Sequence, residues 1–337
     1  MSPPETSGPP SGRVGFAVIG LGLMGRVHAT EIRRSSRGRL VTVFDADAAA
    51  MDWFSRELSV PASPSIEAAL GRPGVEAVVL ATPPSTHAAL IRLAAGAGKH
   101  VLCEKPLGAT AAEGAEAVAA ARRAGVELRV GFHRRFDPDF ATLARRLRGG
   151  ELGAPRMFAC AMRDPAPPPD AVVRSGEDRL IRDSLCHDLD CARWLMGEVD
   201  SVTALGTAEP RSVFEELGEP DAAVVALRFA SGAVGVIDAT LRAGYFDSRV
   251  EVVGTAGSSS VHGARTAGSF MDRFRGAYGP QIDAFAGAVR GYAGAGADGE
   301  DALRTLILCE AVEESVRHSG RDTAVAGAGL PASSVAD

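Results

Sequence analysis

The stretch Val14-Gly-Phe-Ala-Val-Ile19 is an apolar run that leads directly into Gly20-Leu-Gly22-Leu-Met-Gly25. A strand followed by a glycine turn and a helix is typical of a dinucleotide-binding unit. The first glycine permits the tight turn, the second lets a pyrophosphate approach the backbone, and the third lets the helix pack on the strand. The free N–H groups at the start of that helix face the phosphates. Contacts with the cofactor are therefore expected from Gly20, Gly22, Leu23, Met24 and Gly25.

A second apolar run, Leu40 to Phe44, ends in an acid, Asp45, at about twenty residues from Gly25. An acidic side chain at this distance accepts hydrogen bonds from the ribose hydroxyls of the adenosine. It also repels a 2′-phosphate. The sequence therefore predicts that the chain binds NAD and disfavours NADP.

The composition excludes several other classes of protein. The 337 residues, 46% of them hydrophobic, suffice for about two domains with sizeable cores. A net charge of −6 without a long basic run argues against nucleic acid as a partner. No apolar stretch approaches the roughly 20 residues that cross a membrane. Residues 1–12 are rich in Pro, Ser and Gly, and we expect a disordered extension there and not a signal peptide. The five cysteines form no CxxC pair, which favours reduced thiols in a cytoplasm.

Apolar runs alternate with helical patterns as far as residue 131. Strands are expected at Val14–Ile19, Leu40–Phe44, Ala77–Leu80, His100–Cys103 and Val126–Val130, and helices near 23–36, 47–58, 86–97 and 110–124. This alternation predicts an α/β fold with a doubly wound parallel sheet, a Rossmann domain over residues 13–131. In such sheets, ligands bind beyond the carboxyl ends of the strands.

The pattern changes in the second half of the chain. Apolar runs at 199–205, 222–229, 233–239 and 249–253 follow one another without long helices between them, and helices are expected at 182–197 and near 280–290 and 300–318. Ser231-Gly232 is typical of a hairpin turn. We therefore predict an α+β domain with an open, mostly antiparallel sheet over 132–323, followed by a flexible tail over 324–337. This domain is also the candidate for binding the substrate. A sheet with few covering helices exposes an apolar face, so the domain is expected to build a homo-oligomer, a tetramer or a dimer.

Lysine is rare in this chain, since only two of the 36 basic residues are lysines, Lys99 and Lys105. A lysine that remains is a candidate for chemistry that needs a compact ammonium. Lys105 follows the strand that ends at Cys103, and Pro106 helps to fix its backbone as the chain leaves the sheet. The segment Ala81-Thr-Pro-Pro84 ends the preceding strand at the same edge. Further cofactor contacts are therefore expected from Thr82, Pro83, His87, Glu104 and Lys105.

Asp183 and His187 are four residues apart within the helix expected over 182–197, so they share one face. A carboxylate beside an imidazole fixes its tautomer or raises its pKa, as a general base near neutral pH requires. The same spacing is also typical of a surface ion pair, or of Asp183 as an N-cap. Cys186 and Cys191 point to different sides of the helix, so no metal is expected.

Several motifs together resemble the glucose–fructose oxidoreductase/inositol dehydrogenase (Gfo/Idh/MocA) family, most closely its inositol 2-dehydrogenase branch. They are Gly-Leu-Gly-Leu-Met-Gly-Arg-Val-His at 20–28, Ala-Thr-Pro-Pro at 81–84, Glu-Lys-Pro-Leu at 104–107, Gly-Phe-His-Arg-Arg-Phe-Asp at 131–137, Arg-Asp-Pro-Ala-Pro-Pro-Pro at 163–169 and Asp-x-x-x-His-Asp-x-Asp at 183–190. The resemblance extends from Gly15 to about Arg317. It implies a Rossmann domain followed by an open, mainly antiparallel domain that often builds a homotetramer.

The resemblance implies roles for individual residues. The catalytic set is Lys105, Asp183 and His187. Substrate contacts are implied for that set and for Arg134, Asp164 and Tyr245, and a position near the nicotinamide for Tyr278. His133 departs from the family, which more commonly has Met or Asn beside the paired arginines.

Oxidation of a secondary alcohol requires its oxygen to lose a proton as the hydride leaves. His187, oriented by Asp183, is the expected base, and Lys105 is expected to stabilise the same oxygen. The sequence leaves open which of the two takes the proton. The expected function is NAD-dependent oxidation of a cyclic polyol, and the resemblance implies conversion of inositol to inosose. Two alternatives remain: an oxidoreductase acting on another sugar or keto-sugar, including those of sugar-nucleotide and antibiotic-sugar pathways, and a non-catalytic member that senses a dinucleotide or sugar.

Overall fold

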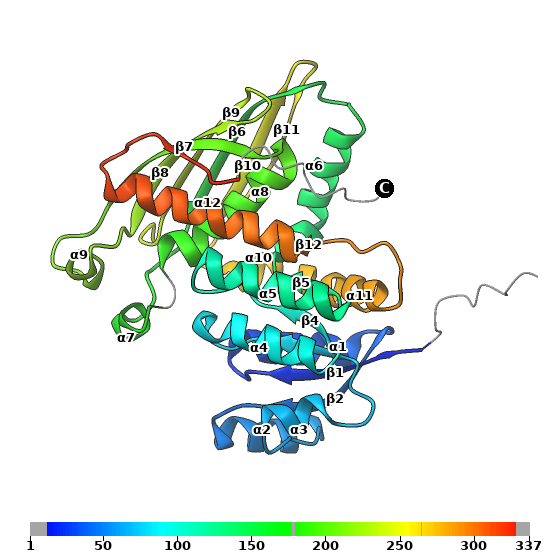
Figure 1. Ribbon diagram of the computed structural model, residues 1–337. Helices are drawn as coiled ribbons and strands as arrows, with labels where there is room; N and C mark the ends of the chain where they lie inside the picture. The colour runs from blue at the N-terminus through cyan, green and yellow to red at the C-terminus, as the bar shows by residue number, and fades with distance from the viewer. Residues whose placement is uncertain (1–11, 177–178, 264, 328–337) are drawn as a thin grey trace, which may run out of the picture.

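The structure is a computed structural model that describes residues 12–176, 179–263 and 265–327 (Figure 1). Its first sheet has the strand order β12-β5-β4-β3-β1-β2, with β1 to β5 parallel and β12 antiparallel to β5. The strands are β1 (Val14–Ile19), β2 (Gly38–Phe44), β3 (Ala77–Leu80), β4 (His100–Cys103), β5 (Leu128–Val130) and β12 (Ala297–Asp298). The helices beside it are α1 (Leu23–Arg34), α2 (Ala48–Leu58), α3 (Ile66–Leu70), α4 (Pro84–Gly96), α5 (Ala111–Ala124) and α11 (Tyr278–Val289). The predicted doubly wound parallel sheet is confirmed.

Helices cover both faces of this sheet. Helices α4 and α5 pack side by side on one face, and α1 packs against α11 on the other (Figure 1). All residues of β1 and β3 are buried, as is typical of strands in a parallel sheet with two covered faces. Phe16 of β1 meets Phe285 of α11 with ring centroids 5.9 Å apart. The apolar runs of the sequence are therefore the central layer of the domain.

The second sheet has the strand order β11-β10-β6-β9-β8-β7-β13. Among the described residues, β6 and β9 pair in parallel and all other neighbouring strands of this sheet pair antiparallel. Its strands are β6 (Pro155–Arg163), β7 (Val199–Thr207), β8 (Ala222–Phe229), β9 (Val234–Thr240), β10 (Asp247–Gly254), β11 (Ser258–Val261) and β13 (Thr323–Ala324). The expected hairpin joins β8 to β9 at Ser231-Gly232, where Gly232 has φ +82°. The open, mostly antiparallel sheet is thus confirmed.

One face of the second sheet is covered by helices (Figure 1). The remaining helices are α6 (Pro138–Arg148), α7 (Asp170–Arg174), α8 (Cys186–Met196), α9 (Val213–Leu217), α10 (Phe270–Phe274) and α12 (Gly299–Arg317), with 3-10 turns η1 (His133–Phe136) and η3 (Arg275–Ala277) and the π-helical turn η2 (Leu180–Leu185). Helices α8 and α12 pack against β6 and β7, respectively. The other face leaves large apolar side chains in solvent: Val224 is 50% exposed and Leu205 is 60% exposed. Within the described ranges, no helix combines the length and the apolarity that crossing a bilayer requires.

The structure differs from the expected domain boundaries. Residues 132–323 do not form one separate unit, because α11 packs on α1 and β12 extends the first sheet beside β5. Ala324, expected in the tail, belongs to β13, which pairs with β7. The expected disordered extension lies outside the described residues except for Gly12, and so does most of the expected tail.

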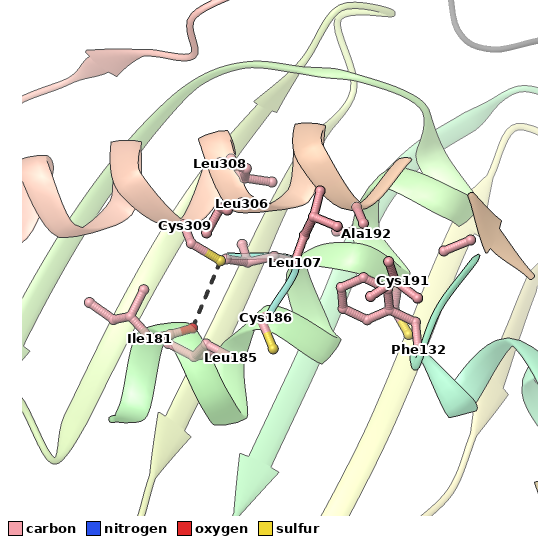
Figure 2. Packing of buried hydrophobic residues seen from close by; sticks show 14 of the residues in the cluster. Leu107, Phe132, Ile181, Leu185, Cys186, Cys191, Ala192, Leu306, Leu308 and Cys309 are labelled. Carbon is pink, nitrogen blue, oxygen red and sulfur yellow. Dashed lines mark hydrogen bonds between the residues drawn. The ribbon is translucent and has the colours of Figure 1, made fainter. Parts of the chain in front are cut away.

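The helix expected over 182–197 is divided into η2 and α8. Apolar packing holds both pieces: Ile181 and Leu185 of η2 lie under α12, and the thiol of Cys309 contacts the carbonyl oxygen of Ile181 at 3.9 Å (Figure 2). Leu107, which follows the carboxyl end of β4, belongs to the same cluster (Figure 2). The loop after β4 and the start of α8 are therefore packed against each other.

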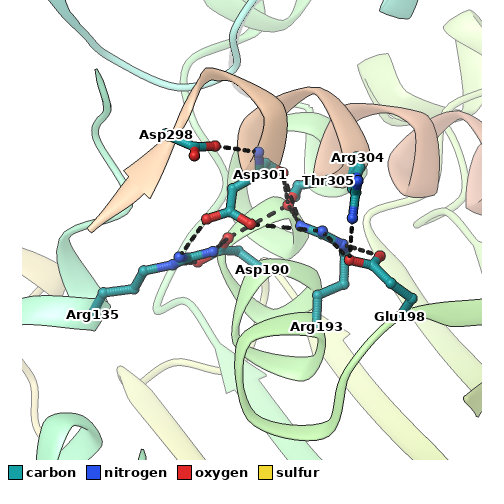
Figure 3. Close-up of polar contacts among 8 residues, drawn as sticks. All are labelled: Arg135, Asp190, Arg193, Glu198, Asp298, Asp301, Arg304 and Thr305. Atoms are coloured by element: carbon teal, nitrogen blue, oxygen red, sulfur yellow. Dashed lines mark hydrogen bonds and ion pairs between the residues drawn. The ribbon is translucent and has the colours of Figure 1, made fainter. Parts of the chain in front are cut away.

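A network of buried charges fixes the other end of α8 (Figure 3). Arg135 of η1 donates two hydrogen bonds to Asp190 of α8, at 2.9 and 2.7 Å, and a third to Asp301 of α12 at 2.9 Å. Arg193 of α8 forms a bidentate pair with Glu198. Such paired, hydrogen-bonded charges hold three segments in one arrangement.

Candidate functional site

The glycine turn after β1 has the geometry that a dinucleotide requires. Gly20 has φ +88°, and a Cβ there would lie 2.3 Å from the carbonyl oxygen of Ala81. A Cβ on Gly25 would lie 1.9 Å from the carbonyl oxygen of Gly20, so only glycine permits this approach of α1 to β1. Gly22, in contrast, has no atom within 4 Å of the Cβ position and makes no side-chain cap to α1. Open space and free N–H groups at the start of a helix suit a pyrophosphate.

Asp45 lies at the end of β2, beside this turn. Its Oδ2 accepts the N–H of Leu21 at 2.6 Å, and its Oδ1 accepts the N–H of Asp47 at 2.8 Å. These bonds hold the carboxylate at the side of the glycine turn where the adenosine ribose is expected. The structure therefore holds this carboxylate beside the glycine turn, and its contact with the ribose remains a prediction.

His87 ties together the loops that follow β3 and β4. Its Nδ1 lies 2.7 Å from the carbonyl oxygen of Pro106, and its Nε2 lies 2.8 Å from the carbonyl oxygen of Thr82. The side chain is fully buried, and this burial lowers its pKa. His87 was expected to contact the cofactor, but both ring nitrogens already face carbonyl oxygens. His87 therefore joins the two loops at the edge of the sheet, and its contact with the cofactor remains a prediction.

Glu104, at the carboxyl end of β4, is buried and lies 2.6 Å from Nε2 of His28. Burial would raise the pKa of Glu104, but the hydrogen bond to His28 and the charge of Lys105 hold it below its usual value. A Cβ on Gly131 would lie only 2.8 Å from the carboxylate, so a glycine is needed beside it. No role for His28 was expected from the sequence, although His28 is the last residue of the Gly-Leu-Gly-Leu-Met-Gly-Arg-Val-His motif at 20–28. Its position four residues along α1 from Met24 places it on the side of the helix that faces β4.

Lys105 and Asp183 form an ion pair between the two domains. Nζ of Lys105 donates to Oδ1 of Asp183 and also lies 3.2 Å from the carbonyl oxygen of Asp183. Burial would lower the pKa of Lys105, but the charge of Asp183 raises it above its ordinary value. The Asp183 carboxylate therefore favours the ammonium form of Lys105. The structure thus brings two members of the expected catalytic set into contact.

His187, at the start of α8, differs from its expected state. Its Nδ1 is buried and has no hydrogen-bond partner. Nδ1 therefore makes no hydrogen bond to Asp183, the residue expected to orient His187. Burial lowers the pKa of His187 well below 6.5, and the charges of His133, Lys105 and Arg134 lower it further. The sequence left open whether Asp183 fixes the tautomer of His187 or raises its pKa, and the lowered pKa favours a neutral imidazole over the second effect.

The candidates for substrate contacts lie around this cluster. Arg134 is buried and donates a hydrogen bond to Asp188, a residue for which the sequence predicted no role. Nε of Arg134 has no hydrogen-bond partner. Burial raises the pKa of Asp164 to about 6, against the opposing effect of Arg134. Tyr278 is buried with an unpartnered hydroxyl, and its ring lies 5.1 Å from that of His133.

Tyr245 lies in the loop between β9 and β10. The guanidinium of Arg265 lies over its ring, 5.1 Å from the centroid. Tyr245 is partly exposed, so its contact with substrate remains a prediction. The described ranges contain no group of three or more His, Cys, Asp or Glu side chains placed to hold a metal ion.

Comparisons with known proteins agree with this geometry. A family model described as "Oxidoreductase family, NAD-binding Rossmann fold" matches residues 14–132, and one described as "GFO/IDH/MocA C-terminal domain" matches residues 140–260. The chain is similar to the uncharacterized oxidoreductase YrbE of Bacillus subtilis, with 35% identity over 89% of this chain and 93% of the relative. It is also similar to an inositol 2-dehydrogenase of Rhizobium meliloti, with 34% identity over 90% of this chain and 97% of the relative.

Among solved structures, the fold is similar to that of a myo-inositol dehydrogenase from Corynebacterium glutamicum. The TM-score is 0.86 at 26% identity, with 95% of this chain and 100% of that chain covered. The fold of nearly the whole chain thus has a counterpart in a solved structure. The chain belongs to the Gfo/Idh/MocA family of oxidoreductases, whose N-terminal domain is an NAD-binding Rossmann fold.

Proposed function

We propose that this chain is an NAD-dependent dehydrogenase that oxidises a ring secondary alcohol of an inositol to the corresponding inosose. The observation that carries the proposal is the Lys105–Asp183 ion pair, with neutral His187 at the start of the next helix, at the edge of the sheet that carries the glycine turn. Its relatives named inositol 2-dehydrogenase support inositol as the substrate. The myo isomer and its 2-position are the first choices.

The residues at the dinucleotide edge fit NAD. The glycine turn would hold the pyrophosphate at Gly20, Gly22 and Gly25, with Leu23 and Met24 beside it, and Asp45 would hold the ribose. Thr82, Pro83, Glu104 and Tyr278 would line the remaining length, and the hydroxyl of Tyr278 has no hydrogen-bond partner within the protein. NAD bound there supplies the acceptor for the hydride.

The two basic side chains take different roles because their charges differ. Lys105 is already protonated, so it donates a hydrogen bond to the substrate oxygen and stabilises the negative charge that develops there. His187 is neutral, so it can accept the hydroxyl proton. Asp183 holds the ammonium of Lys105 in place. We therefore assign proton removal to His187.

The substrate side of the cluster suits a ring with many hydroxyls. Arg134 has an unpartnered buried Nε, and Asp164 is a partly buried carboxyl with a pKa raised by burial to about 6. A hydroxyl both donates and accepts, so it can satisfy either group. A substrate that lacks a hydroxyl would leave such a group unpaired, which strongly lowers reactivity. Arg134, Asp164 and Tyr245 are therefore proposed as the specificity contacts.

A screen of inositol isomers tests the substrate. The purified protein is mixed with NAD and each isomer at several pH values, and NADH formation is measured. Reduction of NAD by at least one inositol is expected. If the protein binds NADH but no inositol reduces NAD, the substrate assignment fails and a keto-sugar substrate takes its place.

The preference for NAD is expected to depend on Asp45. Replacing it with Ser removes the charge that opposes a 2′-phosphate, so the ratio of kcat/KM for NAD over NADP should fall by about tenfold or more, roughly 1.4 kcal/mol. Asp47→Ser is the matched control, because Asp47 caps α2 and Ser is also a good cap. An unchanged ratio in Asp45→Ser would contradict the role of this carboxylate.

The open face of the second sheet is proposed to bind a second copy of this chain, giving a dimer or a tetramer. Val224 and Val236 project from adjacent strands, β8 and β9, into solvent. Contiguous apolar surface of this kind usually marks an interface. Val224→Arg combined with Val236→Arg should yield monomers by light scattering, whereas Leu93→Arg, on α4 of the other domain, should not. A wild-type monomer at micromolar concentration would disprove the interface.

The compartment is proposed to be the cytoplasm. All five cysteines are buried free thiols. Free thiols without disulfides are typical of reducing compartments.

A further inference from the structure

His133 is a titratable side chain that lies beside His187 and that the mechanism above does not use. It lies in η1, the turn that connects the two domains, and it is buried. Its ring centroid lies 4.7 Å from that of His187, 4.9 Å from that of Phe274 and 5.1 Å from that of Tyr278. Its place between the proposed base and Tyr278 calls for a function.

Two ring nitrogens in this contact lack partners. Nδ1 of His187 and Nε2 of His133 are both buried without a hydrogen bond. An unsatisfied buried polar atom costs about 1–3 kcal/mol, and native proteins largely avoid it. A neutral imidazole has one donor and one acceptor nitrogen, so two neighbouring rings can satisfy each other. The two rings meet edge-on, with an interplanar angle of 62°.

The charges around the pair explain why no carboxylate takes this role. Asp183 is held by Lys105, and Asp188 is held by Arg134. The titratable groups that face His133 are cationic or neutral. They are His28, Lys105, Arg134, Arg273 and Tyr278. A neutral acceptor is therefore the kind of partner that this environment provides for His187.

We propose that His133 is a positioning residue that accepts the Nδ1–H of His187 on its own Nε2. This bond holds His187 in the tautomer whose Nε2 carries the free lone pair, and that lone pair takes the hydroxyl proton of the substrate. After the transfer, His187 carries a proton on each nitrogen and still donates from Nδ1 to His133. The proposal extends the proton-removal step of the proposed function and rests on it.

A neutral partner affects the pKa of His187 differently from a carboxylate. A carboxylate stabilises the imidazolium strongly and raises its pKa. A second imidazole fixes the tautomer with a weaker effect on basicity, in agreement with the lowered pKa of His187. The pair is therefore suited to accept a proton and to release it again.

The test is the tautomer of His187 in protein without cofactor or substrate. Nitrogen-15 NMR of histidine-labelled protein at pH 8 reports which ring nitrogen carries the proton, and His187→Asn identifies the signals. In the wild type, the proton is expected on Nδ1. In His133→Phe, which keeps a ring but has no acceptor, the proton should move to Nε2 or be shared between both nitrogens. In His133→Gln, whose Oε1 can accept, the wild-type tautomer should return.

Kinetics give a second measurement. The loss of a tautomer-holding partner lowers kcat by up to about 10⁴ where that partner is a carboxylate. For the neutral His133, we expect a loss of about tenfold or more in kcat for His133→Phe, with recovery of most of it in His133→Gln. The affinity for NADH, measured by fluorescence, should change little in either variant.

The outcomes separate a positioning role from a packing role. An unchanged tautomer in His133→Phe overturns the proposal, and so does a His133→Gln protein that has the tautomer of the Phe variant. If Phe disrupts the fold, judged by circular dichroism, His133→Leu takes its place in the same measurement. Because NMR needs no substrate, a protein that oxidises no inositol would contradict the proposed function without deciding the tautomer.

Discussion

Lys105→Met is expected to lower kcat by about 10²–10⁴-fold while the affinity for NADH changes by no more than about twofold. Methionine keeps the length of the side chain and removes the ammonium that we assign to the developing negative charge. The glycine turn and Asp45, which are proposed to hold the pyrophosphate and the ribose, are untouched. Steady-state kinetics and fluorescence titration with NADH measure the two quantities.

The other lysine of the chain supplies the control. Lys99 donates from Nζ to the carbonyl oxygen of Val75 at 2.8 Å, at the opposite end of β4 from Lys105. Lys99→Met therefore removes an ammonium of the same kind without affecting the site, and turnover should be kept. If Lys105→Met also keeps wild-type turnover, the ion pair with Asp183 is structural and the proposed mechanism is wrong.

The first domain could be predicted from sequence because its signals are local. Each strand–turn–helix unit is written in consecutive residues, and the glycines report close approaches within that unit, such as that of Gly25 to Gly20. The structure begins α1 and α5 within one residue of the expected starts. Local steric rules are sufficient for this part of the fold.

Contacts between distant segments could not be predicted in the same way. Strand β12 has two residues, Ala297 and Asp298, and exists because the chain returns to pair with β5. No pattern marks a strand of that length. The partner of Arg134 is a second example. Asp188 binds Arg134 and Asp183 binds Lys105, and this choice depends on how α8 packs against η1.

The relation between Asp183 and His187 shows how one local irregularity changes a site. Four residues span one face of a continuous α-helix, which was the basis of the expected pair. The structure instead has a π-helical turn, Leu180–Leu185, before α8. The wider turn of a π-helix changes the directions of the side chains that it contains, and such turns are frequent at functional sites. In this arrangement Asp183 binds Lys105, and Nδ1 of His187 has no hydrogen-bond partner.

His187→Asn is expected to lower kcat/KM by about 10²–10⁴-fold at neutral pH. Asparagine is polar and of similar length but cannot take up the proton. Proton removal must then fall to solvent hydroxide, so the residual rate should rise with pH. His318→Asn is the control, because His318 is exposed and pairs with Glu314 at the surface. A variant at position 187 that keeps wild-type kcat/KM would assign proton removal to another group.

The pH dependence of the wild type follows from the direction of the pKa shift. The pKa of His187 lies well below 6.5, so the ring is neutral and able to act from pH 6.5 upward. As the pH falls through the lowered pKa, the ring takes a proton and kcat/KM should fall.

The unfolded chain binds the same proton already near pH 6.5, so folding stability is lost below that value as well. His133 and His87, whose pKa values are also lowered by burial, add to this loss. The acid limb of kcat/KM must therefore be measured on protein shown by circular dichroism to be folded. A limb centred at or above pH 6.5 in folded protein would show that His187 is not the neutral base proposed here.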